Sequence, residues 1–95
     1  MEKIKTMVNI GGRDYTIVSL DPLEYIQRVA LYVDRKFTDI ELSGKGMSYS
    51  MIATLTAVHM ADELFKLKED LARLQMDYRQ LQERLDLPVQ ENQTL

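Results

Sequence analysis

Residues 64–85 read LFKLKEDLARLQMDYRQLQERL, and their large apolar positions recur in unbroken steps of three and four residues. Two apolar positions in every seven form the a/d pattern of a coiled coil, whose apolar line is stable only against another helix. We call this line the seam and expect it to mediate oligomerisation. Together with one preceding methionine, its members are Met60, Leu64, Leu67, Leu71, Leu74, Tyr78, Leu81 and Leu85.

The seam needs a partner helix that covers it, because a long exposed apolar line favours aggregation. No other segment of the sequence carries a matching repeat, so the partner helix comes from another copy or from a different protein, and self-association is the simpler option. An antiparallel pair would set Leu67 against Tyr78, and a parallel pair would set Glu63 beside Lys68. Both are acceptable, so the orientation stays open. A helix folded back on its own head is the alternative, but no later segment is available to cover residues 64–85.

The helix that carries the seam begins near Ser48 or Ser50, since either side chain can cap it. No glycine or proline follows until Pro88, so the helix spans about 38 residues, or about 57 Å. Its first half is apolar on more than one side, which is typical of a helix buried in a packed head. We expect an α/β head at 1–50, a long helix at 51–87 that packs on the head to about residue 62 and continues as a coiled coil, and a flexible tail at 88–95.

Two further elements are predicted in the head. Apolar and β-branched residues flank Gly11-Gly12, which indicates a β-hairpin at about 3–19, since glycine accepts the positive φ of tight hairpin turns. Asp21-Pro22-Leu23-Glu24 is typical of a helix start with a capping box. An apolar stripe then predicts an amphipathic helix at about 22–42, formed by Leu23, Ile26, Val29, Ala30, Val33, Phe37 and Ile40. The predicted fold class is α+β.

Composition excludes several functions. The chain has 95 residues, 45 % apolar and 28 % charged, with a net charge of −3 and no cysteine. Residues 51–95 carry the whole acidic excess, which argues against binding nucleic acid or an anionic membrane surface. The N-terminal sequence MEKIKTMVNI lacks the apolar core of a signal peptide, and no run is long enough to span a membrane. We therefore expect a cytoplasmic protein without membrane insertion.

The sequence contains no pattern of catalytic or cofactor-binding residues. His59 is the single histidine and lies within the long helix, where a structural role is the simplest interpretation. Adjacent carboxylates such as Asp62 and Glu63 point to different sides of a helix and do not share a site. The glycines form no phosphate-binding motif. We expect a protein that is not an enzyme and that binds no metal or cofactor.

Three blocks of sequence, in order, resemble the bacterial cell division protein ZapA family. The first is VNIGGRDYTI at 8–17, the second is EYIQRVALYVDRKFTDIE at 24–41, and the third is ADEL at 61–64. The resemblance covers roughly residues 4–82. It implies a head that dimerises, C-terminal helices that join two dimers into an elongated tetramer, and binding to FtsZ, the tubulin-like GTPase of the division ring. Filaments of FtsZ would then be bundled at midcell.

The resemblance also implies where FtsZ binds: charged residues at the hairpin turn and around the end of the first helix. Carried over position by position, Arg13 in the sequence GGRDY is the best match. An arginine suits such a role, because FtsZ proteins are acidic as a class and its rigid donor fork fits carboxylates. The full set of candidates is Arg13, Asp14, Arg35, Lys36, Asp39, Glu41 and Lys45. The alternatives are a generic coiled-coil adaptor or a small DNA-associated regulator. A regulator of the bZIP type would have a basic region before its heptads, where this chain has the apolar run MIATLTAVHM.

Overall fold

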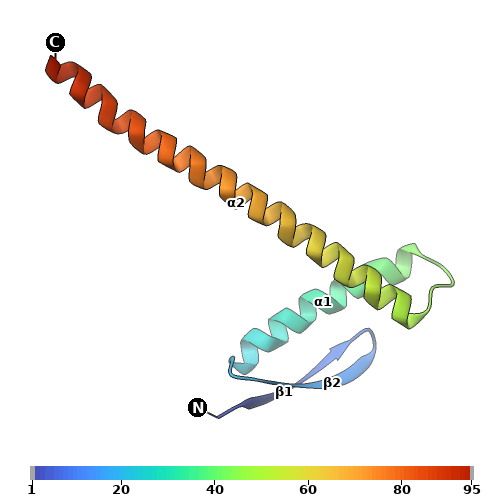
Figure 1. Cartoon of the computed structure of the whole chain (residues 1–95). Helices are drawn as coiled ribbons and strands as arrows, with labels where there is room; N and C mark the ends of the chain where they lie inside the picture. Colours follow the sequence, from blue (N-terminus) through green and yellow to red (C-terminus); the bar gives the residue numbers. More distant parts are fainter. Residues whose placement is uncertain (1, 95) are drawn as a thin grey trace. The chain divides into compact units, whose positions relative to one another are not determined.

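The computed structural model describes residues 2–94, and the side chains of residues 2–86. Its elements are, in order, β1 (Ile4–Ile10), β2 (Arg13–Ser19), α1 (Leu23–Ser43) and α2 (Tyr49–Thr94). They divide into two compact units, Met1–Met60 and Ala61–Leu95, which we call the head unit and the distal unit. Figure 1 shows the hairpin, the shorter helix and the long helix, so the predicted α+β fold is confirmed.

The hairpin closes through a two-residue turn. Gly11 and Gly12 have φ values of +62° and +81°, which only glycine adopts without strain and which match a type I′ turn. The antiparallel pairing begins with Ile10 opposite Arg13 and ends with Ile4 opposite Ser19. The predicted hairpin is therefore present, with its strands in the expected places.

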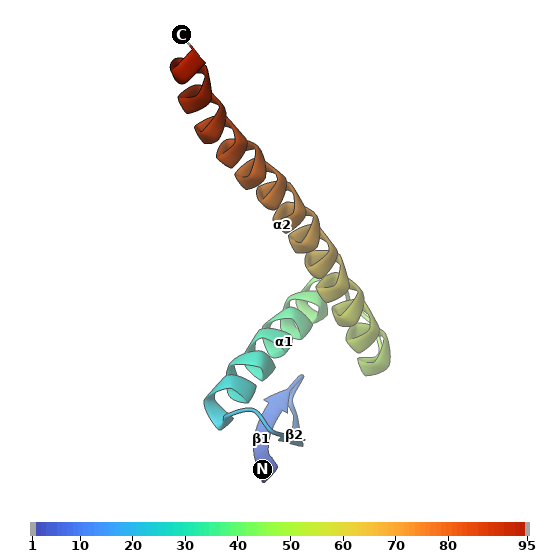
Figure 2. The ribbon, with the colours of Figure 1, turned by 60° about the vertical axis from the view of Figure 1, so that its left-hand side comes forward.

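Two small apolar clusters hold the head unit together. In the first, Val8 of β1 packs with Ile26 and Ala30 of α1, which lies against the hairpin in both ribbon views (Figure 2). In the second, Phe37 of α1 packs with Ile52 of α2. Successive side chains of β1 alternate between this packed face and solvent. The hairpin is thus held on one face, mainly through β1.

Helix α1 buries a narrower stripe than the sequence predicts. Its four buried residues are Ile26, Ala30, Phe37 and Ile40. Leu23 and Val29, which the predicted stripe included, are exposed. The physical reason is that the two-stranded hairpin covers only one side of the helix, so residues at the border of the stripe stay in contact with water.

The start of α1 differs from the prediction. Asp21 does not cap the helix; its backbone N–H instead donates to Ser19 Oγ at 3.1 Å. Pro22 is the residue before the helix and makes no side-chain cap, and its ψ of 151° is extended. The helix therefore starts one residue later than predicted, at Leu23, which leaves the Asp21 carboxylate too early in the chain to close a capping box with Glu24.

The start of α2 confirms one of the two predicted caps. Ser48 Oγ accepts a hydrogen bond from the Met51 N–H at 3.1 Å, and the Ser48 carbonyl accepts from the Ile52 N–H at 3.0 Å. The prediction that this part of α2 is buried on more than one side is wrong for the single chain. Met51 and Val58 are exposed, because α1 and the hairpin lie against one face of the helix only.

The far end of α2 also differs from the prediction. The helix continues through Pro88 to Thr94, whereas the sequence predicts an end at Asp86–Pro88 and a tail at 88–95. An interior proline lacks the N–H of the helical ladder and its ring crowds the carbonyl four residues earlier, at about 3 kcal/mol. This weakens the helix at Pro88, but the residues beyond it still have backbone partners and continue it. The side chains of the predicted tail lie outside the described residues.

The fold yields a prediction about a buried hydroxyl. Thr6 is 0 % exposed, and among the described residues its Oγ1 has no hydrogen-bond partner. Thr6→Val keeps the shape and removes the unpaired group, so the free energy of unfolding should rise by about 1 kcal/mol. Urea unfolding at one fixed protein concentration measures it.

Thr56→Val is the matched control. Thr56 is 3 % exposed, but its hydroxyl donates to the Ile52 carbonyl at 2.7 Å. Here the same substitution removes a hydrogen bond and should lower stability by up to about 1 kcal/mol. A Thr6→Val variant that loses as much stability as the control would contradict the prediction.

Candidate functional site

The hairpin turn is fixed by contacts from both helices. The Gly11 N–H donates to Asp34 Oδ1 of α1 at 2.9 Å. The Tyr49 hydroxyl, at the first position of α2, donates to the Ile10 carbonyl at 3.1 Å. These two bonds join the turn to both helices of the head unit, so the residue that follows the turn, Arg13, has a defined position.

Arg13 lies on the ring of Tyr49. Its guanidinium carbon is 3.6 Å from the ring centroid, which is close contact for a cation on an aromatic face. On other sides Tyr49 meets the Phe37 ring, 4.8 Å away between centroids and tilted by 46°, and the Tyr15 hydroxyl, 3.1 Å from its own. We call Arg13, Tyr15, Phe37 and Tyr49 the turn cluster.

Electrostatics within the turn cluster favour the neutral form of Tyr49. The hydrogen bond with Tyr15 raises the pKa of the Tyr49 hydroxyl above its ordinary value of 10.0, and desolvation adds to the rise. The charge of Arg13 acts in the opposite direction and lowers this pKa. At neutral pH the hydroxyl is therefore protonated and able to donate to the Ile10 carbonyl.

An open apolar groove adjoins the turn cluster. Its volume is about 410 Å³, and its walls include Tyr15 and Ile17 of β2, Val33 and Phe37 of α1 and Ala53 of α2. Because α1 packs mainly on β1, the inner face of β2 remains partly uncovered. The groove is thus an accessible apolar surface of the head unit.

The other predicted binding residues do not join Arg13 in one cluster. Asp14 follows Arg13 in the strand and so points to the opposite face, where its carboxylate accepts a hydrogen bond from Asn9 Nδ2 at 2.8 Å. Lys36 is half-buried, with Nζ 5.4 Å from the centroid of the Tyr32 ring. The remaining candidates are exposed: Arg35, Asp39, Glu41 and Lys45.

Two of these candidates share a second, smaller depression. Lys36 and Asp39 line it together with His59, and its volume is about 270 Å³.

Among the described residues no group of three or more metal-ligating side chains is present, and none of the described helices has the length and apolar character of a membrane span.

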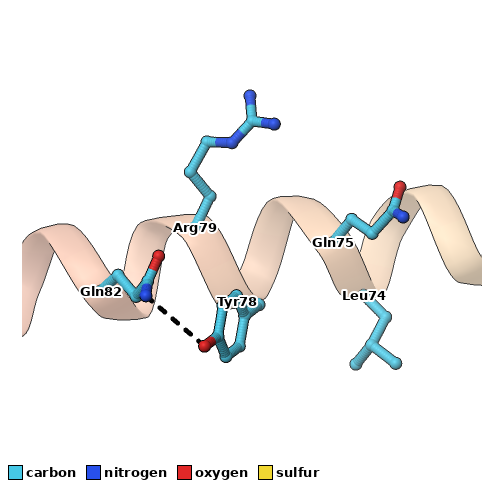
Figure 3. A pocket seen from close by; sticks show the side chains of 5 residues that line it. All are labelled: Leu74, Gln75, Tyr78, Arg79 and Gln82. Atoms are coloured by element: carbon cyan, nitrogen blue, oxygen red, sulfur yellow. Dashed lines mark hydrogen bonds between the residues drawn. The ribbon is translucent and has the colours of Figure 1, made fainter.

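The distal unit presents the seam to solvent. From Leu64 to Leu85 the apolar members of the seam are all exposed, and Leu74 is 65 % accessible. Figure 3 shows that Leu74 and Tyr78 project to one side of the helix while Gln75 and Arg79 project to the other. The predicted apolar line is therefore a continuous strip on one side of α2.

Comparison with known proteins assigns the family. A family model described as cell division protein ZapA matches residues 6–91. The chain belongs to the ZapA family. A cell division protein ZapA from Geobacillus thermodenitrificans is 39 % identical over 72 residues, which cover 76 % of this chain and 79 % of that protein. A cell division protein ZapA from Bacillus licheniformis is 37 % identical over 73 residues, 77 % of this chain and 86 % of that protein.

Two solved structures share the ZapA fold of this chain. A ZapA mutant dimer from Geobacillus stearothermophilus matches with a TM-score of 0.65 and 35 % identity, over 83 % of this chain and 92 % of that one. An unknown conserved bacterial protein from Pseudomonas aeruginosa PAO1 matches with a TM-score of 0.66 and 26 % identity, over 90 % and 94 %. The fold and the resemblance to ZapA predicted from the sequence are thereby confirmed.

Sequence reasoning missed the turn cluster around Arg13. Tyr49 contacts Ile10, from which it is separated by 39 positions, and no periodic pattern encodes so distant a pairing. The available signal was weak: an aromatic residue directly after the capping Ser48, and a glycine pair that leaves no side chain between the turn and α1.

The turn cluster predicts that the two turn glycines respond differently to alanine. A Cβ on Gly11 would lie 2.9 Å from the Phe37 ring and from the Tyr49 hydroxyl, whereas a Cβ on Gly12 meets nothing within 4 Å. Both substitutions strain a positive φ, at about 1–2 kcal/mol. Gly11→Ala should cost about 1–3 kcal/mol more, because it also overpacks the cluster.

Thermal or urea unfolding of both variants checks this, with Gly12→Ala as the matched control. Equal losses of stability in the two variants would contradict the prediction, because they would show that a Cβ at Gly11 does not crowd Phe37 and Tyr49.

Proposed function

We propose that this protein is a non-enzymatic cross-linker that binds FtsZ filaments and bundles them, stabilising the division ring at midcell in the cytoplasm. Membership of a cell division family supports the setting. The mechanism rests on one observation. The side chains of the seam from Leu64 to Leu85 are exposed, and no other described residue of the distal unit covers them.

Self-association follows from two surfaces. The part of the seam that lies in the distal unit extends over 22 positions, Leu64–Leu85, or about 32 Å of helix, which is enough for three heptads of interhelical packing. The head unit adds the apolar groove beside β2, and a related ZapA mutant forms a dimer. We propose that heads pair into dimers and that the seams join two dimers into a tetramer.

Such a tetramer carries more than one filament-binding head. Weak contacts between a head and a filament become a strong cross-link when the second contact is made at high effective concentration. Within each head, Arg13 is the proposed anchor for FtsZ, because its guanidinium is exposed and its donors suit carboxylates. The other candidate residues, Asp14, Arg35, Lys36, Asp39, Glu41 and Lys45, are proposed to contribute at the rim.

Filament pelleting tests this function. Purified protein mixed with polymerised FtsZ at low salt should appear in the pellet and raise light scattering. Arg13→Ala should weaken this binding about tenfold, as expected for loss of an arginine anchor. Added salt should weaken it further, since screening reduces attraction between exposed charges.

Arg79→Ala is the matched control, because it removes an exposed arginine from the distal unit away from the seam. It should bind as the unmodified chain does. Absence of co-sedimentation by the unmodified chain removes the proposed function, and loss of the dimer in Arg13→Ala shows instead that Arg13 is structural.

Assembly through the seam is tested by Leu74→Glu. A carboxylate at the centre of the packed seam would be buried without a partner, at a cost of several kcal/mol, which exceeds the contribution of one layer. The tetramer should therefore split into dimers while the head stays folded. Light scattering measures the mass, and circular dichroism follows the fold.

Met76→Glu introduces the same charge two positions further on, off the seam, at a residue that is 61 % exposed. It should keep the mass of the unmodified protein. Equal masses for Leu74→Glu and the unmodified chain would contradict assembly through the seam.

A further inference from the structure

Tyr49, the first residue of α2, contacts the hairpin, α1 and the side chain of Arg13. Its hydroxyl bonds to the Ile10 carbonyl and to the Tyr15 hydroxyl, and its ring packs on Phe37. One face of the ring is left for the guanidinium of Arg13. No pattern in the sequence assigned a role to this tyrosine.

We propose that Tyr49 is a positioning residue: its ring holds the Arg13 guanidinium in the orientation in which it meets carboxylates on the partner filament. This inference rests on the proposed function, which supplies the acidic partner. Tyr49 acts through Arg13 and makes no contact of its own with that partner.

The geometry suits such a role. At 3.6 Å from the ring centroid, the guanidinium is held against the ring by one of its faces, while its N–H donors lie in its own plane. Among the described residues no carboxylate forms an ion pair with Arg13. The donor fork is therefore oriented by the ring and still available to a carboxylate.

The contact is closer than the other cation–ring contacts of the described chain. Arg28 lies 5.8 Å from the centroid of Tyr25, and Lys36 lies 5.4 Å from that of Tyr32. Both of those tyrosines are exposed, whereas Tyr49 is half-buried and fixed by three neighbours. Of these three contacts in the described chain, the Arg13 contact is the shortest, and its ring is held by Ile10, Tyr15 and Phe37.

A fixed arginine binds more tightly than a free one. Ordering a long side chain at an interface opposes binding, and an arginine that is already held avoids much of that loss. The expected gain in affinity is about twofold to tenfold. The gain applies to a planar anion that accepts two parallel N–H bonds, which is the chemistry of an exposed aspartate or glutamate.

The test is FtsZ filament pelleting with two variants of the whole chain. Tyr49→Leu removes the ring, whereas Tyr49→Phe keeps the ring and removes only the hydroxyl. Leucine should weaken binding about twofold to tenfold. Phenylalanine keeps the ring but loses the hydroxyl bond to the Ile10 carbonyl, so it should weaken binding less than leucine does. Tyr25→Leu is the matched control, since it removes a ring from a looser cation contact of the same head. It should leave binding unchanged.

A double substitution separates positioning from folding. If Tyr49 acts through Arg13, Tyr49→Leu brings no further loss of binding in the Arg13→Ala background. If Tyr49 merely supports the head, leucine weakens both backgrounds by the same factor, and that result overturns the inference.

A substitution of nearly unchanged shape covers the case in which leucine unfolds the head. Pentafluorophenylalanine at position 49 keeps the packing against Phe37 but inverts the charge distribution of the ring, so it repels a cation. It should bind more weakly than Tyr49→Phe. Equal binding by these two variants overturns the inference while the proposed function stands. If the unmodified chain stays in the supernatant when FtsZ filaments sediment, the proposed function itself is overturned.

Discussion

Apolar side chains that a single copy cannot bury constrain everything else in this protein. The described chain buries six hydrophobic residues, in two separate clusters, and leaves a much larger set of leucine, methionine and tyrosine side chains in water. A core of that size contributes little against the conformational entropy of the chain. Association with further copies is the available route to more burial, and in the distal unit the strip to be covered is straight and regular.

The two units place different demands on the sequence. The distal unit needs only a repeat, because any helix with the same spacing can cover an apolar strip. The head unit needs particular neighbours: Gly11 must lack a side chain for Phe37 and Tyr49 to approach the turn. Surface ion pairs add little to either requirement. Lys66–Asp62 and Arg73–Asp70 are both more than half exposed, so water and salt screen them.

The same distinction explains how far sequence reasoning reached. The hairpin turn and the seam follow from local rules, a positive φ at glycine and a repeat of seven, and both were predicted. Capping by Asp21 and a helix end at Pro88 also rest on local rules but failed. The extended backbone of Pro22 delays the start of α1 to Leu23, and a proline weakens a helix without having to end it. The platform beneath Arg13 joins distant parts of the chain, and no local rule predicts it.

The proposed binding residue and the contacts that stabilise the head unit are both found at the hairpin turn. Asp34 holds the Gly11 N–H and Tyr49 holds the Ile10 carbonyl, so the turn is fixed on both sides by side chains that also belong to the packing of the head. Arg13 is the first residue of β2 after that turn, and its backbone inherits the same restraint. A change in the packing of α1 or of the first turn of α2 therefore alters the position of the guanidinium without touching it. Half-buried residues of the head unit thus position the proposed binding residue, although they need not contact the partner themselves.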